Sequence, residues 1–96
     1  MLKSFIGKFV VVRTVTAGVH TGTLEHLEDK TAVLSEARRV WRWNEANTLN
    51  ELANKGCCMD YSRISEPTAY IILTEAIEII DATGAKENLT LSRWPA

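Results

Sequence analysis

The first half of the chain alternates short apolar runs with polar turns, a pattern that predicts antiparallel strands. Residues 9–13 are rich in β-branched side chains and form the first expected strand. A turn at residues 16–18 leads to a second strand over residues 19–27. Within it, Gly22 marks either a bulge or a place where another segment approaches closely. These two segments predict a β-hairpin.

The next segments extend this hairpin into a meander. Residues 28–30 are a second polar turn, and residues 31–34 and 38–43 read as further strands. Ser35 and Glu36 separate them as a short interruption. Because each connection is short, neighbouring strands are expected to pair antiparallel.

A different pattern follows residue 43. Thr48 stands three positions before Glu51, which is the spacing of a helix capping box. The apolar residues within 49–53 form one stripe on such a helix. Gly56 stands where glycine commonly ends a helix, in a left-handed conformation. The sequence therefore predicts one short helix here.

The remaining segments are less regular. Residues 57–68 have no clear period, although Pro67 imposes extended geometry on the residue before it. Residues 70–80 fit both helix and strand periods, and their isoleucines favour a strand with a kink near Thr74. A helical turn is expected over residues 83–89. Trp94 lies so late that it needs burial against its own domain or a neighbouring subunit.

Composition narrows the class of protein. The chain has 96 residues, of which 46% are hydrophobic and 24% charged, as in a folded globular domain. We expect one α+β domain over residues 1–96: a small antiparallel β-sheet or barrel-like meander with one or two short helices.

No apolar run approaches the roughly 20 residues of a membrane span, and no leader segment is visible, so we expect no membrane partner and a cytoplasmic location. The net charge of −1 argues against a nucleic-acid partner.

Catalytic and metal-binding patterns are missing from the sequence. There is no glycine-rich phosphate loop and no nucleophile elbow. His20 and His26 lie on one expected strand, about 20 Å apart at 3.3 Å per residue, too far to share a metal ion. Cys57 and Cys58 are adjacent and are expected to be free thiols. We therefore expect neither an enzyme nor a metal or cofactor.

Residues 37–43 concentrate three arginines and two tryptophans. On a strand, side chains alternate between faces, so Arg39, Trp41 and Trp43 would share one face and Arg38 would lie on the other. Indole rings stack on a base and a guanidinium meets a phosphate, which predicts a site for a flat anionic ligand. The alternative interpretation is that the tryptophans pack in the core and the arginines cover its rim.

Four further residues are candidates for the same site. Arg13 and His20 approach it from the first hairpin if the strands pair as expected. Thr74 and Glu75 offer hydrogen bonds to a ribose.

Three motifs in order resemble a family of small phage proteins. They are Ala-Arg-Arg-x-Trp-x-Trp at residues 37–43, Thr-Leu-x-x-Leu-Ala at residues 48–53 and Ile-Leu-Thr-Glu-Ala-Ile-Glu-Ile at residues 72–79. This pattern resembles the type 1 Thoeris anti-defence proteins. The resemblance implies a sponge that binds cyclic ADP-ribose isomers made by bacterial TIR-domain enzymes and leaves them intact, in the cytoplasm of the infected host. It also implies self-assembly into dimers or hexamers, pockets between subunits and separate sites for cyclic oligonucleotides.

Two other classes remain open. Residues 7–12 followed by residues 17–24 look like the opening hairpin of Sm-like RNA-binding barrels. The slightly negative charge and the lack of a later RNA-binding motif argue against that class. A structural or protein-interaction component of a phage is the third alternative.

Overall fold

The computed structural model describes residues 5–43, 48–57 and 62–91, which form an antiparallel sheet and two short helices. The expected α+β fold is therefore confirmed. Cys58 and Trp94 lie outside the described residues. No helix in the described ranges is long and apolar enough to cross a membrane. The elements are β1 (Phe9–Thr14), β2 (Val19–Glu28), β3 (Thr31–Arg42), α1 (Leu49–Lys55), β4 (Arg63–Ile64), β5 (Thr68–Leu73), β6 (Ala76–Asp81), the 3₁₀ helix η2 (Thr83–Ala85) and α2 (Lys86–Leu91).

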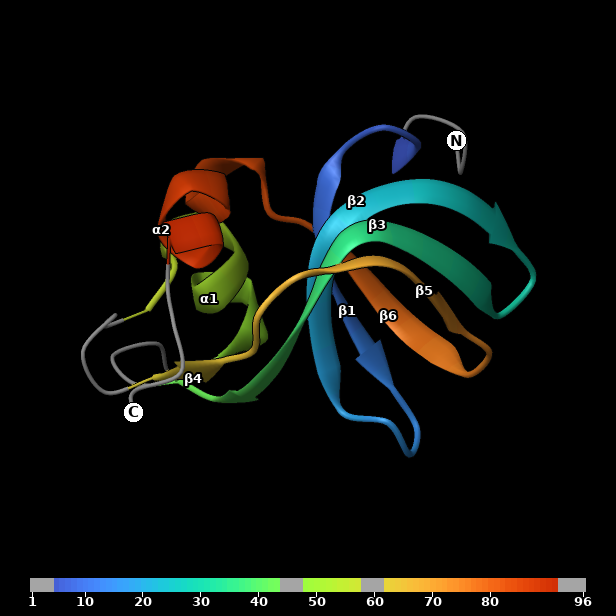
Figure 1. The fold of residues 1–96 in the computed structure, drawn as a ribbon, viewed down its shortest axis with the longest axis horizontal. Helices are drawn as coiled ribbons and strands as arrows, with labels where there is room; N and C mark the ends of the chain where they lie inside the picture. Colours follow the sequence, from blue (N-terminus) through green and yellow to red (C-terminus); the bar gives the residue numbers. More distant parts are fainter. Residues whose placement is uncertain (1–4, 44–47, 58–61, 92–96) are drawn as a thin grey trace.

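The sheet follows the strand order β4–β3–β2–β1–β6, and β5 pairs with β3 beside this path. Strands β1, β2 and β3 form the antiparallel meander that the short turns predict. β3 is shared between two partners: its first half pairs with β5, while Val40 and Arg42 pair with β4. In Figure 1 the strands curl into a barrel-like half of the molecule, and both helices lie on the side of β4.

Two strand boundaries differ from those that the sequence predicts. Ser35 and Glu36 do not interrupt the sheet, because Glu36 adopts a left-handed conformation (φ 49°) and the extra residue is absorbed as an irregularity in the pairing of β2 with β3. The single strand expected over residues 70–80 is divided at Thr74 and Glu75 into β5 and β6. At this kink the chain leaves the edge of β3 and reaches the edge of β1.

The curled sheet separates two apolar clusters, because β1 is covered on both faces. Successive residues of its apolar run point in opposite directions, with Val10 and Val12 on one face and Val11 on the other. The barrel core, on the side of Val10, also contains Leu24, Ala32, Leu34, Ala37, Leu73 and Ala76. The helix-side core, on the side of Val11, contains Phe9, Val40, Leu52, Ala53, Cys57, Ile64, Ala82, Ala85 and Leu89.

The predicted helix cap at Thr48 is confirmed at α1. Thr48 takes an extended conformation and its side-chain oxygen accepts a hydrogen bond of 3.1 Å from the backbone N–H of Glu51. Gly56 ends the helix with a φ of 83°. Next to it, the Asn88 side chain of α2 bonds both the backbone N–H and the carbonyl of Cys57, at 2.9 and 3.0 Å. This amide ties the two helices together.

Gly22 lies where β2 and β3 approach each other closely, one of the two roles that its position in the sequence suggested. A Cβ atom added there would lie 2.9 Å from the carbonyl oxygen of Ser35 and 3.3 Å from the Cα of Ala37. Both are backbone atoms of the irregular segment around Glu36, so they cannot move aside as a flexible side chain would. A side chain at this position would therefore have to displace the backbone of β3.

We predict that Gly22→Ala lowers the free energy of unfolding by about 1–3 kcal/mol, the usual cost of forcing an extra methyl group into a packed site. Urea denaturation monitored by circular dichroism measures it. Glu36→Gly is the matched control in the same bulge: it removes the left-handed strain and should leave stability within about 0.5 kcal/mol of the wild type. A Gly22→Ala variant as stable as the wild type would show that the close approach is not required.

Candidate functional site

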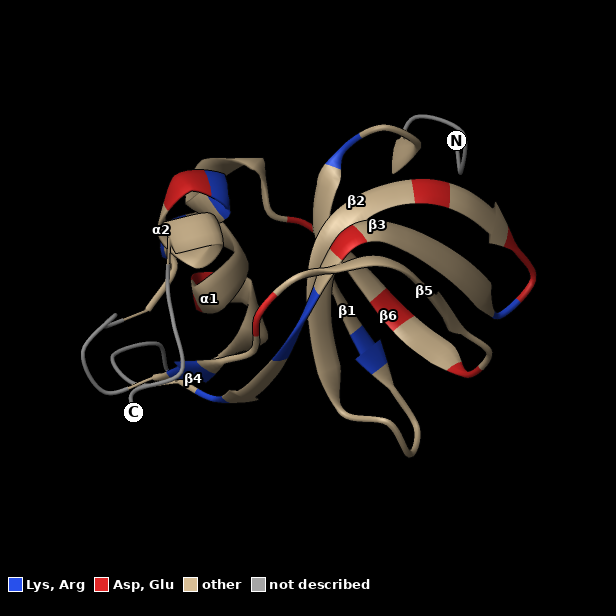
Figure 2. Cartoon of the chain, viewed as in Figure 1, with Lys and Arg blue, Asp and Glu red and all other residues tan. Residues whose placement is uncertain are grey.

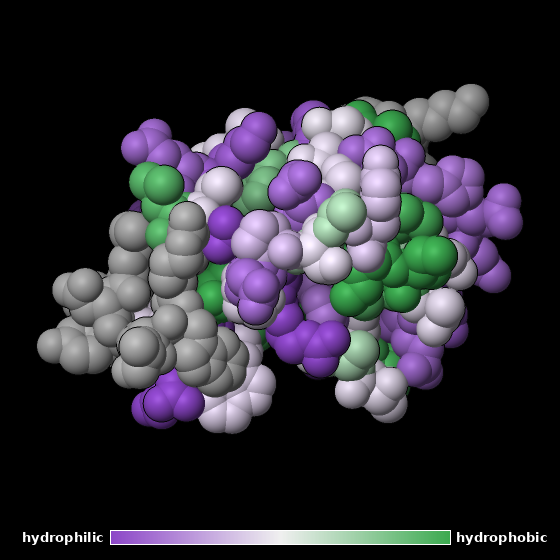
Figure 3. Space-filling model, in the orientation of Figure 1, coloured by the Kyte–Doolittle hydropathy of each residue, from purple (hydrophilic) through white to green (hydrophobic). Residues whose placement is uncertain are grey.

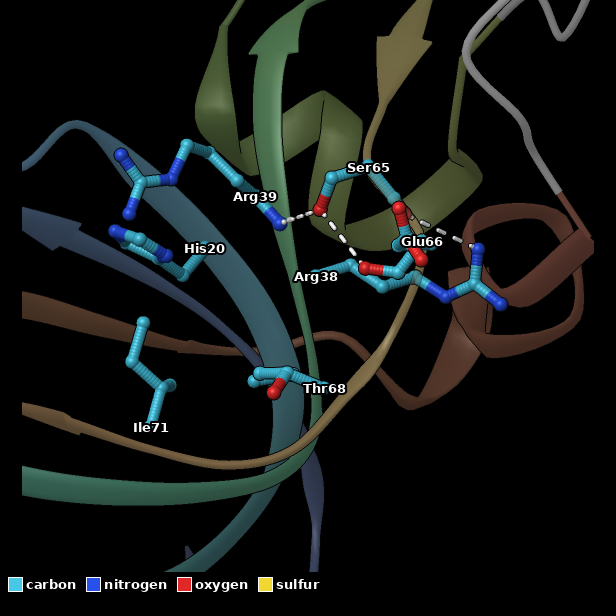
Figure 4. A pocket seen from close by; sticks show the side chains of 8 residues that line it. His20, Arg38, Arg39, Ser65, Glu66, Thr68 and Ile71 are labelled. Atoms are coloured by element: carbon cyan, nitrogen blue, oxygen red, sulfur yellow. Dashed lines mark hydrogen bonds between the residues drawn. The ribbon is translucent and has the colours of Figure 1, made fainter.

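A cleft lies where β2, the second half of β3 and the start of β5 meet. Its volume is about 190 Å³, smaller than the roughly 300–1,000 Å³ typical of pockets that enclose a drug-sized ligand, and it is open to solvent. Three of the sequence-predicted residues, His20, Arg38 and Arg39, line it. The other lining residues are Ala37, Ser65, Glu66, Thr68 and Ile71 (Figure 4).

Arg39 is held through its backbone while its side chain stays exposed. Its N–H donates to the Ser65 hydroxyl oxygen at 2.8 Å, and its carbonyl accepts from the Ser65 N–H at 2.9 Å. His20 stands opposite it in the register of β2 and β3, so the two side chains share one face of the sheet. Figure 4 shows the guanidinium beside the imidazole ring.

His20 is almost fully buried, with 1% of its surface exposed. Nε2 lies 2.9 Å from the carbonyl oxygen of Ala17; since that oxygen only accepts, Nε2 carries the hydrogen and Nδ1 is left as an acceptor. Nδ1 is buried and has no hydrogen-bond partner in the part of the chain that the structure describes. A buried acceptor without a partner costs free energy, because the atom loses its hydrogen bond to water on folding.

Burial is the main cause that lowers the pKa of His20 below its ordinary value of 6.5. The hydrogen bond to Ala17 raises the pKa in part, and the nearby charge of Arg39 lowers it further. The imidazole is therefore neutral near pH 7, and the positive charge at this side of the cleft is that of the Arg39 guanidinium.

Ser65 organises the polar rim. Its hydroxyl accepts from the N–H of Arg39 and donates to the carbonyl of Glu66 at 3.0 Å, so it is fixed in orientation. The exposed Glu66 carboxylate brings a negative charge to the same rim, and β5 contributes the hydroxyl of Thr68 and the apolar side chain of Ile71. These residues lie in or next to the stretch without periodicity, and only Pro67 gave a sign of an ordered extended segment there.

Arg38 points away from Arg39, as strand alternation predicts (Figure 4). It is only 7% exposed, and its Nη1 reaches the carbonyl of Ser65 at 3.5 Å. On that side it also lines a second cleft, together with Lys86 and Thr90 of α2. Its buried position makes it a structural connection between the sheet and the segment after β4.

The two tryptophans do not share a face, contrary to the expectation. Trp41 is 58% exposed, and the guanidinium carbon of Arg63 lies 5.3 Å from the centre of its ring. Trp43 is half-buried and packs against the helix-side core. The physical reason is an irregularity between Val40 and Arg42 in the pairing with β4, which shifts the alternation beyond it.

The remaining candidates do not line the cleft. Arg13 is exposed near the end of β1, opposite Glu78 of β6. Glu75 accepts a hydrogen bond of 2.8 Å from the hydroxyl of Thr16 and so joins the kink to the first turn. Thr74 is exposed in the same kink.

Charge is distributed unevenly around the site. Figure 2 shows basic residues gathered along the second half of β3 and at β4, where Arg38, Arg39, Arg42 and Arg63 lie. Within the described ranges, no group of three or more histidine, cysteine or acidic side chains could hold a metal ion. The cleft thus offers one exposed guanidinium, one exposed carboxylate, one neutral buried acceptor, two hydroxyls and an apolar wall.

The structure is thus a small α+β domain with a cleft beside its curled sheet. Residues 7–89 match a family described as a domain of unknown function, DUF6948. The chain belongs to this family, since the match spans most of its length. No protein with a curated function matches the chain.

The lowered pKa of His20 predicts a pH-dependent stability. Below pH 6.5 the unfolded chain binds a proton at this histidine before the folded chain does. The free energy of unfolding should therefore fall as the pH drops from 6.5 toward the lower folded pKa, by at most about 1.4 kcal/mol per pH unit from this group. Urea denaturation at pH 7.5, 6.5 and 5.5 measures the slope.

His20→Gln should flatten this slope, whereas His26→Gln, which removes an exposed histidine of the same strand, should keep it. Equal slopes in the wild type and in His20→Gln would contradict the assignment of a neutral buried imidazole.

Proposed function

We propose that this protein binds a cyclic ADP-ribose-type signalling nucleotide and holds it without cleavage. In this proposal it acts in the cytoplasm of a phage-infected bacterium, where removal of the messenger blocks Thoeris immunity. The observation that carries the proposal is the pairing, at one cleft, of the exposed Arg39 guanidinium with the buried acceptor Nδ1 of His20.

The chemistry of the cleft suits such a ligand. A guanidinium binds a pyrophosphate through parallel charge-assisted hydrogen bonds. The Nδ1 atom of His20 accepts a hydrogen bond from a ribose hydroxyl or an adenine amine, and Thr68 offers its hydroxyl. Ile71 provides an apolar wall against a purine ring.

A non-catalytic role is supported by the position of Cys57, whose free thiol is buried. Cys57 belongs to the helix-side core, and its backbone N–H bonds Asn88. His20 pairs in register with Val12, which belongs to the barrel core. The sheet therefore lies between this thiol and this imidazole, and they do not form a nucleophile–base pair.

A second candidate function is an Sm-like RNA-binding module. The specific observation in its favour is the strand path β5–β3–β2–β1–β6, which winds a single bent sheet around one apolar core. Binding of a short single-stranded RNA would distinguish this function from the binding of a cyclic nucleotide. A component of a phage particle remains the third alternative and predicts binding of neither RNA nor nucleotide.

We predict that the purified protein removes a TIR-derived cyclic ADP-ribose isomer from solution and returns it intact after heat denaturation. Mass spectrometry of the supernatant before and after heating measures both steps. A cleaved product would identify an enzyme and end the sponge proposal. Retention of RNA without depletion of the nucleotide would favour the Sm-like alternative.

Arg39→Ala should weaken nucleotide binding by about 30-fold or more, because truncating one partner of a desolvated charge pair typically costs 2–5 kcal/mol. Its melting temperature should stay near that of the wild type, since the side chain is exposed. Arg13→Ala removes the same charge outside the cleft and should bind like the wild type in isothermal titration calorimetry. Equal affinity in Arg39→Ala and the wild type would place the site elsewhere.

A further inference from the structure

A second cleft lies between the sheet and α2, on the helix side of β3. Its volume is about 210 Å³. Phe9 and Thr23 stand opposite each other in the register of β1 and β2, and both line it. The other lining residues are Glu36 and Arg38 of β3, Pro67, and Lys86 and Thr90 of α2. Figure 3 shows hydrophilic side chains gathered between the helical half and the curled strands. The proposed function makes no use of this cleft.

Arg38 places a positive charge in a buried position at the second cleft. Only 7% of its surface is exposed, so water screens its guanidinium less than it screens a surface cation. The planar fork of N–H groups matches the two oxygens of a carboxylate. Because folding has already removed most water from this cation and fixed its position, a carboxylate meets a preorganised partner there.

Lys86 brings a second cation to the cleft, from the helix. It is exposed at the start of α2, and Thr90 lies one turn later on the same face of that helix. The Thr90 hydroxyl donates to the Lys86 carbonyl, which holds this side chain against the helix. An anion in the second cleft can therefore meet one cation from the sheet and one from the helix.

Glu36 limits the negative charge that the second cleft accepts. It stands two positions before Arg38, at the bulge where its φ is 49°. Arg38, Lys86 and Glu36 are the charged residues among the described residues that line the cleft, and their charges sum to +1. A singly charged anion neutralises this sum, whereas a doubly charged one leaves an excess negative charge beside Glu36. The cleft therefore favours a monoanion.

The apolar lining favours an organic anion over an inorganic one. Phe9 belongs to the helix-side core, and with Pro67 it gives the cleft apolar surface. An inorganic ion would leave this surface wet, whereas the body of an organic acid covers it. We propose that the second cleft binds a small monocarboxylic acid. Its carboxylate lies between Arg38 and Lys86, and its apolar part packs on the Phe9 side.

Benzoate is the probe for this site, because it joins a carboxylate to a flat apolar ring. Titrated into the isotope-labelled full chain at about pH 7.5, it should shift the backbone amide resonances of Lys86 and Thr90. The dissociation constant should be about 1 mM or less, as is usual for a ligand of so few atoms. Benzamide has the same shape without the charge and should bind about tenfold more weakly or worse. Equal affinity for benzoate and benzamide would overturn the proposal.

Lys86→Ala should raise the benzoate dissociation constant about fivefold or more, because it removes one of the two cations. Lys86 is exposed and does not line the cleft at His20, so this variant should keep its melting temperature and its nucleotide affinity. Lys30→Ala is the matched control: it removes an exposed lysine from the turn between β2 and β3 and should bind benzoate like the wild type. Unchanged benzoate affinity in Lys86→Ala would contradict the site, as would benzoate shifts confined to His20 and Arg39.

Glu36→Gln tests the preference for a monoanion. Phenyl phosphate carries about two negative charges near neutral pH, and the wild type should bind it more weakly than benzoate. The variant raises the summed charge of the cleft to +2 and should narrow this difference about threefold or more. A wild type that prefers phenyl phosphate, or a variant that keeps the wild-type ratio of affinities, would overturn the assignment of a monocarboxylate.

Discussion

The close packing of β2 against β3 at Gly22 is the constraint on which the rest of the structure depends. At this point the backbone of β3 carries an extra residue, with Glu36 in a left-handed conformation, and leaves no room for a Cβ atom on β2. The bulge bends β3, so that its first half pairs with β5 and its second half with β4. One strand can therefore serve both the barrel core and the helix-side core.

The bend also creates the candidate site. Beyond the bulge, Arg38 points to the helix side and is buried, while Arg39 points to the barrel side next to His20. Ser65 then bonds both the backbone N–H and the carbonyl of Arg39. These two bonds hold the segment that leads into β5 next to β3. Two consecutive arginines thus take different roles: Arg38 supports the fold, and Arg39 faces a cleft that holds an unsatisfied imidazole nitrogen.

The sequence predicted those features that depend on local patterns. The helix cap at Thr48, the strands of the first half and the special position of Gly22 rest on propensity and turn chemistry, which act over a few residues. The placement of Trp43 was wrong, because one irregularity against a two-residue strand shifted the alternation. Ser65 and Thr68 were missed because only the tertiary fold brings their aperiodic segment to the cleft.

The central claim is that the cleft between His20 and Arg39 receives the nucleotide. Heteronuclear NMR, with a cyclic ADP-ribose isomer added to labelled protein, tests it through the His20 ring nitrogens, the Arg39 Nε and the Trp41 indole. Binding at the cleft predicts that the His20 Nδ1 and Arg39 Nε resonances shift with added nucleotide while the Trp41 indole N–H stays in place. Shifts confined to Trp41 and Arg63 would contradict the account, because they would put the ligand on the exposed tryptophan instead.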